Sequence, residues 1–192
     1  MGYKRKSRGR IHAIEKLGKS LTAAEIGIGA GMEPALVRAT QKREGLEIMT
    51  EIVLNLGTSK AAIASFADDD VIGVDGAAAN VMKWTQAVFG RLLSMEMVCF
   101  ESPVTGDDDL RLYLHSAAVN ANAPTAGSGT DINNGAWATG INDSHVFATD
   151  TYTASPYFHL TQQDGAPVAG TYSAGKFVLR VIGQADPENS DI

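Results

Sequence analysis

The sequence holds a single cysteine, Cys99, so an intrachain disulfide cannot form and a disulfide-stapled secreted module is excluded. No apolar run approaches the roughly 20 residues that a membrane helix needs. The basic start of the chain is not followed by the apolar segment of a secretory signal. With 192 residues, the chain is long enough for one domain that buries a core without metal or disulfide support.

The motifs that carry most enzyme chemistry are also missing from the sequence. Gly18-Lys19-Ser20 matches the end of a phosphate loop, but Ala13 stands where that loop needs its first glycine. The four histidines lack the spacing of a helical two-histidine metal motif. The acidic triplets 68–70 and 107–109 are interpreted as solvated turns, with a structural cation as the alternative. We therefore expect no catalytic residue, no metal site and no cofactor, and a hydrolase on a β scaffold is the weakest hypothesis.

What the sequence does have is a strong charge polarity. The first 45 residues hold ten of the sixteen basic residues and four acidic ones, whereas the remaining 147 hold six basic and eighteen acidic residues. A basic lead before an acidic body is typical of an arm that binds a negatively charged partner outside its own fold. The basic residues that we assign to partner binding are Lys4, Arg5, Lys6, Arg8 and Arg10.

Beyond this basic stretch, weak helical signals precede residue 46. Ile11, Ile14 and Leu17 fall at helical spacing up to Leu21, and we assign these three to partner binding as an apolar contact. Thr22-Ala-Ala-Glu25 resembles a capping box. Pro34 and Gly45 are placed to start and stop a helix over Ala35–Glu44. These signals predict a basic N-terminal arm with short helices over residues 1–45.

From residue 46 the pattern changes to strands. Leu46–Leu56, Asn80–Gln86, Arg91–Glu101, Leu110–His115, Tyr157–Thr161 and Lys176–Gly183 are rich in β-formers and are separated by turn signals. Phe177, Leu179 and Val181 alternate on one face of the last strand. Both faces of Arg91–Glu101 are largely apolar, which predicts a strand covered on both sides. We expect an antiparallel β-sandwich over residues 46–185, followed by an acidic tail over 186–192.

The stretch 116–145 is the least regular part of the sandwich region and is predicted to be a long loop that carries Trp137. A loop of this length in a compact domain is usually functional or contact-forming, so Trp137 is assigned to partner binding. An alternative function follows from the same residue. Trp137, with Trp84 and tyrosines such as Tyr157 and Tyr172, could line a sugar-binding face of a carbohydrate-binding module for host attachment.

Four segments of the body resemble small structural proteins of tailed-bacteriophage virions, chiefly the head decoration or cement type. They are Glu51–Gly57, Ser94–Gly106, Asp109–Leu114 and Ala169–Gly183, the last with a Gly-Thr-Tyr-x-Ala-Gly-Lys turn before the final strand. The resemblance implies a β-sandwich of jelly-roll type that binds a capsid shell and has no catalytic residues. The basic arm has no counterpart in this resemblance.

Together these observations predict a non-enzymatic virion structural protein located in the capsid. Its expected partners are the major capsid protein and neighbouring copies of itself, with a homo-oligomer on the shell. The arm is expected to reach acidic protein surface; contact with nucleic acid, if the arm faces inward, is the less favoured alternative. No contact with a membrane is expected.

Overall fold

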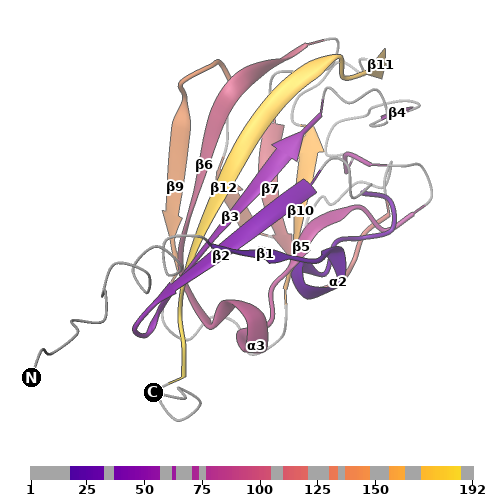
Figure 1. Ribbon diagram of the computed structural model, residues 1–192. Coiled ribbons are helices and arrows are strands. Elements are labelled where there is room, and N and C mark those ends of the chain that lie inside the picture. Colours follow the sequence, from indigo (N-terminus) through magenta and orange to yellow (C-terminus); the bar gives the residue numbers. More distant parts are fainter. Residues whose placement is uncertain are drawn as a thin grey trace, which may run out of the picture.

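We describe the fold from a computed structural model. The described residues are 18–32, 37–56, 62–63, 71–73, 77–104, 110–120, 130–133, 137–147, 156–162 and 170–186. The described part of the chain consists mostly of antiparallel strands, and the main ones form two sheets that pack face to face (Figure 1). The protein is therefore an all-β antiparallel sandwich, as the alternating strand pattern predicts.

The larger sheet has six strands in the order β1-β2-β3-β12-β6-β9. Their bounds are Lys19–Leu21 for β1, Val37–Glu44 for β2, Glu47–Asn55 for β3, Ala174–Gln184 for β12, Arg91–Val104 for β6 and Asn142–Val146 for β9. The predicted final strand is confirmed, because Phe177, Leu179 and Val181 in β12 are each at most 1% exposed and point into the core.

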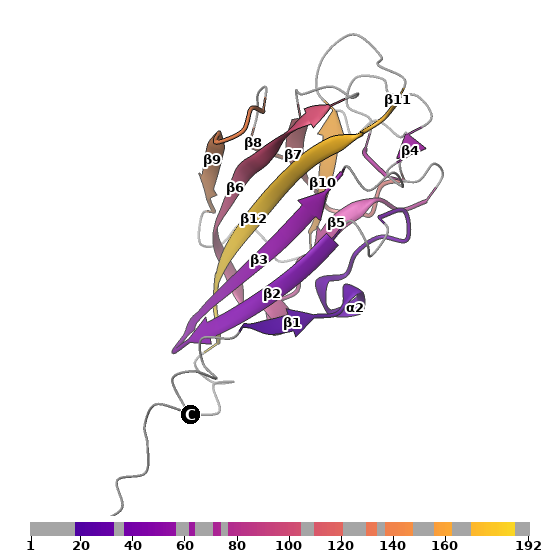
Figure 2. The same cartoon turned by 45° about the horizontal axis from the view of Figure 1, so that its top comes forward.

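The smaller sheet has four strands in the order β5-β10-β7-β8 and lies behind the first (Figure 2). Its strands span Asn80–Lys83 (β5), Tyr157–Gln162 (β10), Leu110–His115 (β7) and Thr130–Asn133 (β8). A two-stranded sheet of β4, Ala62–Ile63, and β11, Gly170–Thr171, is hydrogen-bonded to neither of them.

Two four-residue helices, α2 (Ala23–Ile26) and α3 (Gln86–Phe89), occur in the described part of the chain. Neither is long enough to cross a membrane.

The strand connections follow jelly-roll topology. β7 pairs with β8, β6 with β9, β5 with β10 and β3 with β12, all antiparallel. Along the chain, β7–β8 is the innermost pair, and it is enclosed in turn by β6–β9, β5–β10 and β3–β12. Successive pairs lie alternately in the smaller and the larger sheet. This arrangement is the jelly roll that the sequence resemblance implies. β1 and β2 extend the larger sheet beyond β3.

The predicted helix over Ala35–Glu44 is wrong. Residues from Val37 to Glu44 form β2, which pairs with β3 over its whole length. Gly45, at φ 61°, stands in the two-residue turn between these strands and does not end a helix. The helix predicted up to Leu21 is also wrong at its end, because Lys19–Leu21 form β1. The larger sheet therefore begins well before the boundary expected between residues 45 and 46.

The capping box at the start of α2 is confirmed. The Thr22 backbone N–H donates to Glu25 Oε2 at 2.8 Å, and the Glu25 backbone N–H donates to Thr22 Oγ1 at 3.2 Å. Hydrogen bonds from Lys19 and Thr22 lower the pKa of Glu25 to about 2. The helix ends after one turn because Gly27 adopts φ 70°.

Two further predictions about the body are corrected. The short connection at residues 87–90, with a glycine suited to positive φ, predicts a hairpin between Asn80–Gln86 and Arg91–Glu101. The connection instead joins β5 to β6 in different sheets through α3, although Gly90 does have a positive φ of 67°. The region 116–145 is not strandless, because it contains β8 and β9.

Candidate interaction surface

The outer face of the six-stranded sheet is open to solvent and carries apolar side chains in rows across the strands. In one row, Val53 of β3 lies opposite Val178 of β12, which lies opposite Val98 of β6. The alternation of a β-strand places these three on the same face, away from the core. A cross-strand row of three valines therefore crosses the centre of the sheet on its outer side.

A second apolar row crosses the same strands nearer to the turn between β2 and β3. Met49 of β3 pairs with Ile182 of β12, Ile182 with Ser94 of β6, and Ser94 with Val146 of β9. Val146 is 78% exposed. The expectation that both faces of the β6 strand are covered is therefore wrong, because only its inner face, with Met95, lies in the core.

Phe100 adds the largest apolar side chain to this outer face. It is 54% exposed and lies where the register between β6 and β12 shifts, between the pairs Cys99–Phe177 and Glu101–Lys176. A bulge inserts one residue into a strand and re-aims its side chains. We define the outer-face patch as the apolar side chains of the two rows and this bulge: Met49, Val53, Val98, Phe100, Val146, Val178 and Ile182.

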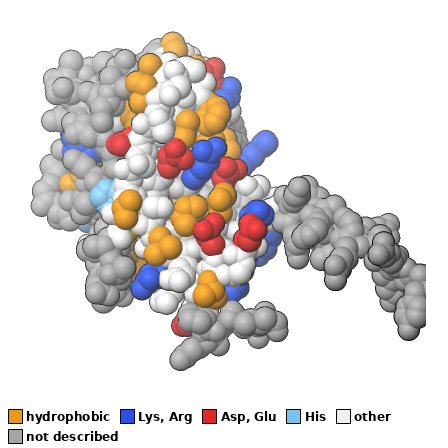
Figure 3. Space-filling view, turned by 90° about the vertical axis from the view of Figure 1, so that its left-hand side faces the viewer, with side chains coloured by type: hydrophobic (Ala, Val, Ile, Leu, Met, Phe, Trp, Pro, Cys, Tyr) orange, Lys and Arg blue, Asp and Glu red, His pale blue; other side chains and the backbone are white. Residues whose placement is uncertain are grey.

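An ion-paired row separates the two apolar rows. Arg180 of β12 donates from Nε to Glu51 Oε1 and from Nη1 to Glu96 Oε2, each at 3.1 Å. The hydrogen bonds to Glu51 and Glu96 raise the pKa of Arg180. Figure 3 shows hydrophobic side chains on both sides of adjoining acidic and basic ones on this side of the molecule.

Two lysines near the patch are paired as well. Lys176 Nζ lies 2.6 Å from Glu101 Oε2, and Lys42 Nζ lies 3.0 Å from Glu44 Oε2. Because each of these cations has an acidic neighbour, the face presents little net charge to a partner. It is suited to an apolar or mixed protein surface and poorly suited to a polyanion, which requires clustered unpaired cations.

The residues assigned to partner binding from the sequence lie elsewhere. Lys4, Arg5, Lys6, Arg8, Arg10, Ile11, Ile14 and Leu17 fall outside the described residues. Trp137 is described, and its assignment to a partner-binding loop is wrong. Its side chain is 2% exposed, its Nε1–H donates to the carbonyl oxygen of Leu110 at 2.7 Å, and its ring packs edge-on against Phe177.

The burial of Trp137 also removes the main residue of the alternative sugar-binding face. Trp84 is 6% exposed and Tyr172 is fully buried. Stacking on a sugar needs an accessible aromatic face, which these three side chains do not offer.

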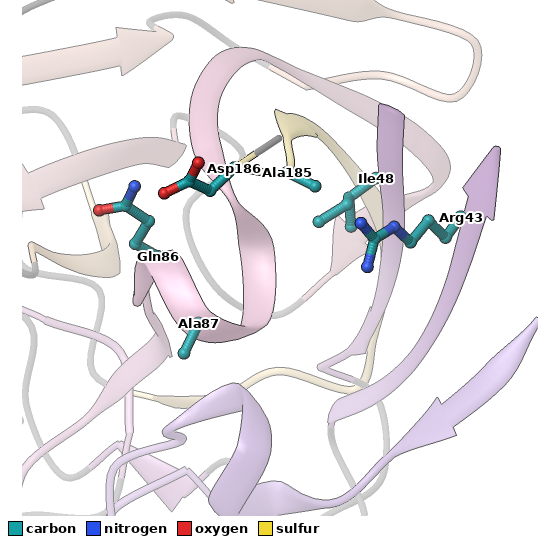
Figure 4. Close-up of a pocket in the computed structure, with 6 residues that line it drawn as sticks. All are labelled: Arg43, Ile48, Gln86, Ala87, Ala185 and Asp186. Atoms are coloured by element: carbon teal, nitrogen blue, oxygen red, sulfur yellow. The ribbon is translucent and has the colours of Figure 1, made fainter. Parts of the chain in front are cut away.

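A hollow at one end of the sandwich, with a volume of about 470 Å³, is lined by residues of β2, β3, α3 and the segment after β12 (Figure 4). Arg43 and Asp186 stand on opposite sides of it (Figure 4), and the Arg43 Nε–H is engaged by the carbonyl oxygen of Gly45 at 3.2 Å. Within the described ranges, no three His, Cys, Asp or Glu side chains are grouped to hold a metal ion.

Among the described residues, a histidine and a cysteine are buried in the body and have shifted pKa values. His159 in β10 is fully buried, and burial lowers its pKa to about 4. Cys99 in β6 is 1% exposed, and burial raises the pKa of its thiol. Cys99 is therefore a small side chain of the core, whereas a reactive thiol needs an accessible setting that favours the thiolate.

Sequence reasoning missed the outer-face patch, although one signal for it was available. Val178 and Ile182 occupy the polar positions of β12, a strand that otherwise alternates cleanly between buried and outward residues. An apolar residue repeated at outward positions of a half-buried strand indicates a contact surface.

Comparison with known proteins gives no family for this chain. No family model matches it, and no curated protein matches it. Among solved structures, a match is the K2 cleaved adhesin domain of Lys-gingipain, with 10% identity over 85% of this chain and 79% of that chain, and a TM-score of 0.25.

Proposed function

We propose that this protein is a non-enzymatic structural component of a virion, a decoration or cement protein that binds and stabilises a capsid shell. The observation that carries the proposal is the outer-face patch. Exposed apolar side chains gathered on one sheet face mark a protein-binding site more often than scattered single ones do. The shell is the partner that the sequence resemblance implies.

The chemistry of the patch fits a repeated, moderate protein contact. Val53, Val98 and Val178 offer a nearly flat apolar strip, and Phe100 projects beside it from the bulge. The neighbouring ion pairs of Arg180 can fix orientation, because charged groups at an interface contribute mainly to specificity and register. Many copies on a symmetric shell then bind with avidity, so each contact can be modest.

The basic arm supplies a second attachment in this proposal. Lys4, Arg5, Lys6, Arg8 and Arg10 would reach acidic surface on the capsid protein or on neighbouring copies, and Ile11, Ile14 and Leu17 would add apolar contact. The arm and the patch are chemically different, since one is cationic and the other close to neutral. Their contributions can therefore be separated by mutation.

The test of the patch uses intact virus particles purified from an infected culture by density banding. The protein is expected to sediment with the particles and to occupy symmetry-related positions in a particle map. The double variant Val53→Ser with Phe100→Ser is expected to lower the number of copies per particle about tenfold, because it removes apolar contact worth roughly 1–2 kcal/mol.

The matched control is Leu46→Ser. Leu46 has the same 39% exposure as Val53 but lies in the turn between β2 and β3, away from the patch. Its occupancy is expected to equal that of the wild type. Absence of the protein from banded particles would contradict the proposed function. An equal loss of copies per particle in Leu46→Ser would show that the patch takes no part in shell binding.

The arm has its own test. Deleting residues 1–10 removes five basic residues and is expected to lower occupancy while leaving the thermal unfolding of the body unchanged. Unchanged occupancy would mean that the arm takes no part in attachment.

A further inference from the structure

β9 is an edge strand of the six-stranded sheet as far as the described residues go. On its inner side it bonds to β6, with the Phe147 N–H donating to the Leu93 carbonyl at 2.9 Å and the Cys99 N–H donating to the Ile141 carbonyl at 2.8 Å. Since backbone groups alternate along a strand, Asn142, Ser144 and Val146 direct theirs away from β6. Within the described ranges, no strand pairs with this outer edge.

The edge lacks most features that protect a sheet from pairing with another chain. Residues 142–146 contain no proline and no lysine, and β9 is five residues long, whereas β1, at the opposite edge of the sheet, has three. The partial protection that exists comes from Asp143, whose Oδ1 accepts the Ser144 backbone N–H at 2.8 Å. A strand of this kind can accept a further strand by backbone hydrogen bonding.

The sequence of β9 is complementary to itself in antiparallel orientation. When two copies pair about a twofold axis at Ser144, all five residues of each strand are matched. Asp143 of one copy then lies opposite His145 of the other, and the same pair recurs on the opposite side of the axis. These are non-hydrogen-bonded positions, at which opposing side chains approach most closely.

We propose that a second copy of this chain docks on the outer edge of β9, so that two six-stranded sheets join into one continuous sheet. On pairing, the Ser144 N–H leaves the Asp143 carboxylate and donates to the Ser144 carbonyl of the second copy. The freed Asp143 carboxylate accepts a hydrogen bond from His145 of that copy. The interface is isologous, since each side contributes the same residues.

This inference goes beyond shell binding and does not depend on it. The outer-face patch continues across the joined strands, because Val146 belongs to both the patch and β9. A dimer would therefore present two patches side by side on one extended sheet, and the pair would bind a shell with two contacts at once.

The first test measures the association of the free full-length protein by analytical ultracentrifugation over a range of concentrations. The wild type is expected to show a monomer–dimer equilibrium. Ser144→Pro is expected to weaken dimerisation by at least about tenfold, because it removes one outward N–H donor from each copy. Proline is tolerated there since this N–H is not bonded to β6.

Ser144→Ala is the matched control, because it keeps the N–H and changes only the side chain. Its dimerisation is expected to match the wild type. A wild type that stays monomeric at every concentration, or a dimer that Ser144→Pro leaves intact, would overturn the proposal.

The second test uses the charge pairs. Asp143→Lys places lysine opposite His145, and His145→Asp places two carboxylates opposite each other, so each single variant is expected to lose dimerisation. The double variant restores an opposite-charge pair and is expected to recover it. A mixture of the two single variants is expected to form heterodimers, and failure of both rescues would overturn the proposed register. Thermal melts of all variants check that each remains folded.

Discussion

The two main sheets of the sandwich differ in what covers their outer faces. In the six-stranded sheet, β12 alternates between buried and outward residues, and the outer face of the sheet is open. In the four-stranded sheet, consecutive residues of β10 from Phe158 to Thr161 are all fully buried. A neighbouring segment contacts an outward side chain of that sheet, since His159 Nε2 lies 3.3 Å from the carbonyl oxygen of Ala117.

The two sheets therefore have different roles, which the alternation of apolar and polar residues in the sequence cannot distinguish. A polar residue at an outward position of β10, such as His159 or Thr161, becomes a buried polar group once segments cover it. An apolar residue at an outward position of β12, such as Val178, remains accessible. The covered sheet contributes stability, whereas the open sheet is available for contact with another protein.

The largest effect is expected from comparing the two faces of β12 at adjacent positions. Phe177→Ala is expected to lower the free energy of unfolding by about 3–5 kcal/mol, because it leaves a cavity in the core. Val178→Ala is expected to cost about 1 kcal/mol or less, since Val178 is on the open face. Urea unfolding measures both. Similar losses for the two variants would mean that the outer face is covered.

An intermediate effect concerns pH and the covered sheet. Burial lowers the pKa of His159 from 6.5 to about 4, so the unfolded chain takes up a proton between these values and the folded chain does not. The contribution of His159 to the free energy of unfolding is therefore fully present above pH 6.5. It is expected to fall by about 3 kcal/mol as the pH drops to 4. Urea titrations at several pH values should show this slope.

The contribution of His159 to that slope can be isolated by two substitutions. His159→Gln is expected to remove this part of the pH dependence, whatever its effect on stability at pH 7. His145→Gln, in the partly exposed strand β9, is expected to keep it. Equal slopes in the wild type and His159→Gln would contradict the assignment.

The smallest effect is expected for the ion pairs on the open face. Arg180→Met removes both contacts to Glu51 and Glu96. Because these side chains are partly exposed, the loss of stability is expected to be at most about 1 kcal/mol and to shrink in high salt. A loss several times larger, unaffected by salt, would show that these charges lie in a shielded environment.

The jelly roll could be predicted because its central strands carry their own signals. β12 alternates, and β3 and β10 are short β-rich runs between turns. β2 could not be recognised, because Gln41, Lys42, Arg43 and Glu44 are good helix formers and only pairing with β3 makes them a strand. Local propensity is weaker than a full ladder of hydrogen bonds to a neighbour.

The interaction surface was harder to predict for a similar reason. The position of Trp137 depends on a hydrogen bond to Leu110, 27 positions earlier, which no local pattern reveals. The exposure of Phe100 depends on a register shift against β12, which is set by a strand far along the chain. Residues whose environment is decided by distant partners are those that sequence patterns place least well.

The nested strand pairing has a consequence for how the protein folds. β12, late in the chain, lies between β3 and β6, and its Arg180 contacts Glu51, 129 positions earlier. Until a growing polypeptide has reached that strand, β3 and β6 have no neighbour between them, and each exposes a bare edge. Such long-range closure slows folding and favours aggregation of the incomplete chain. We therefore expect nascent chains that stop before Ala174 to depend on chaperones to stay in solution.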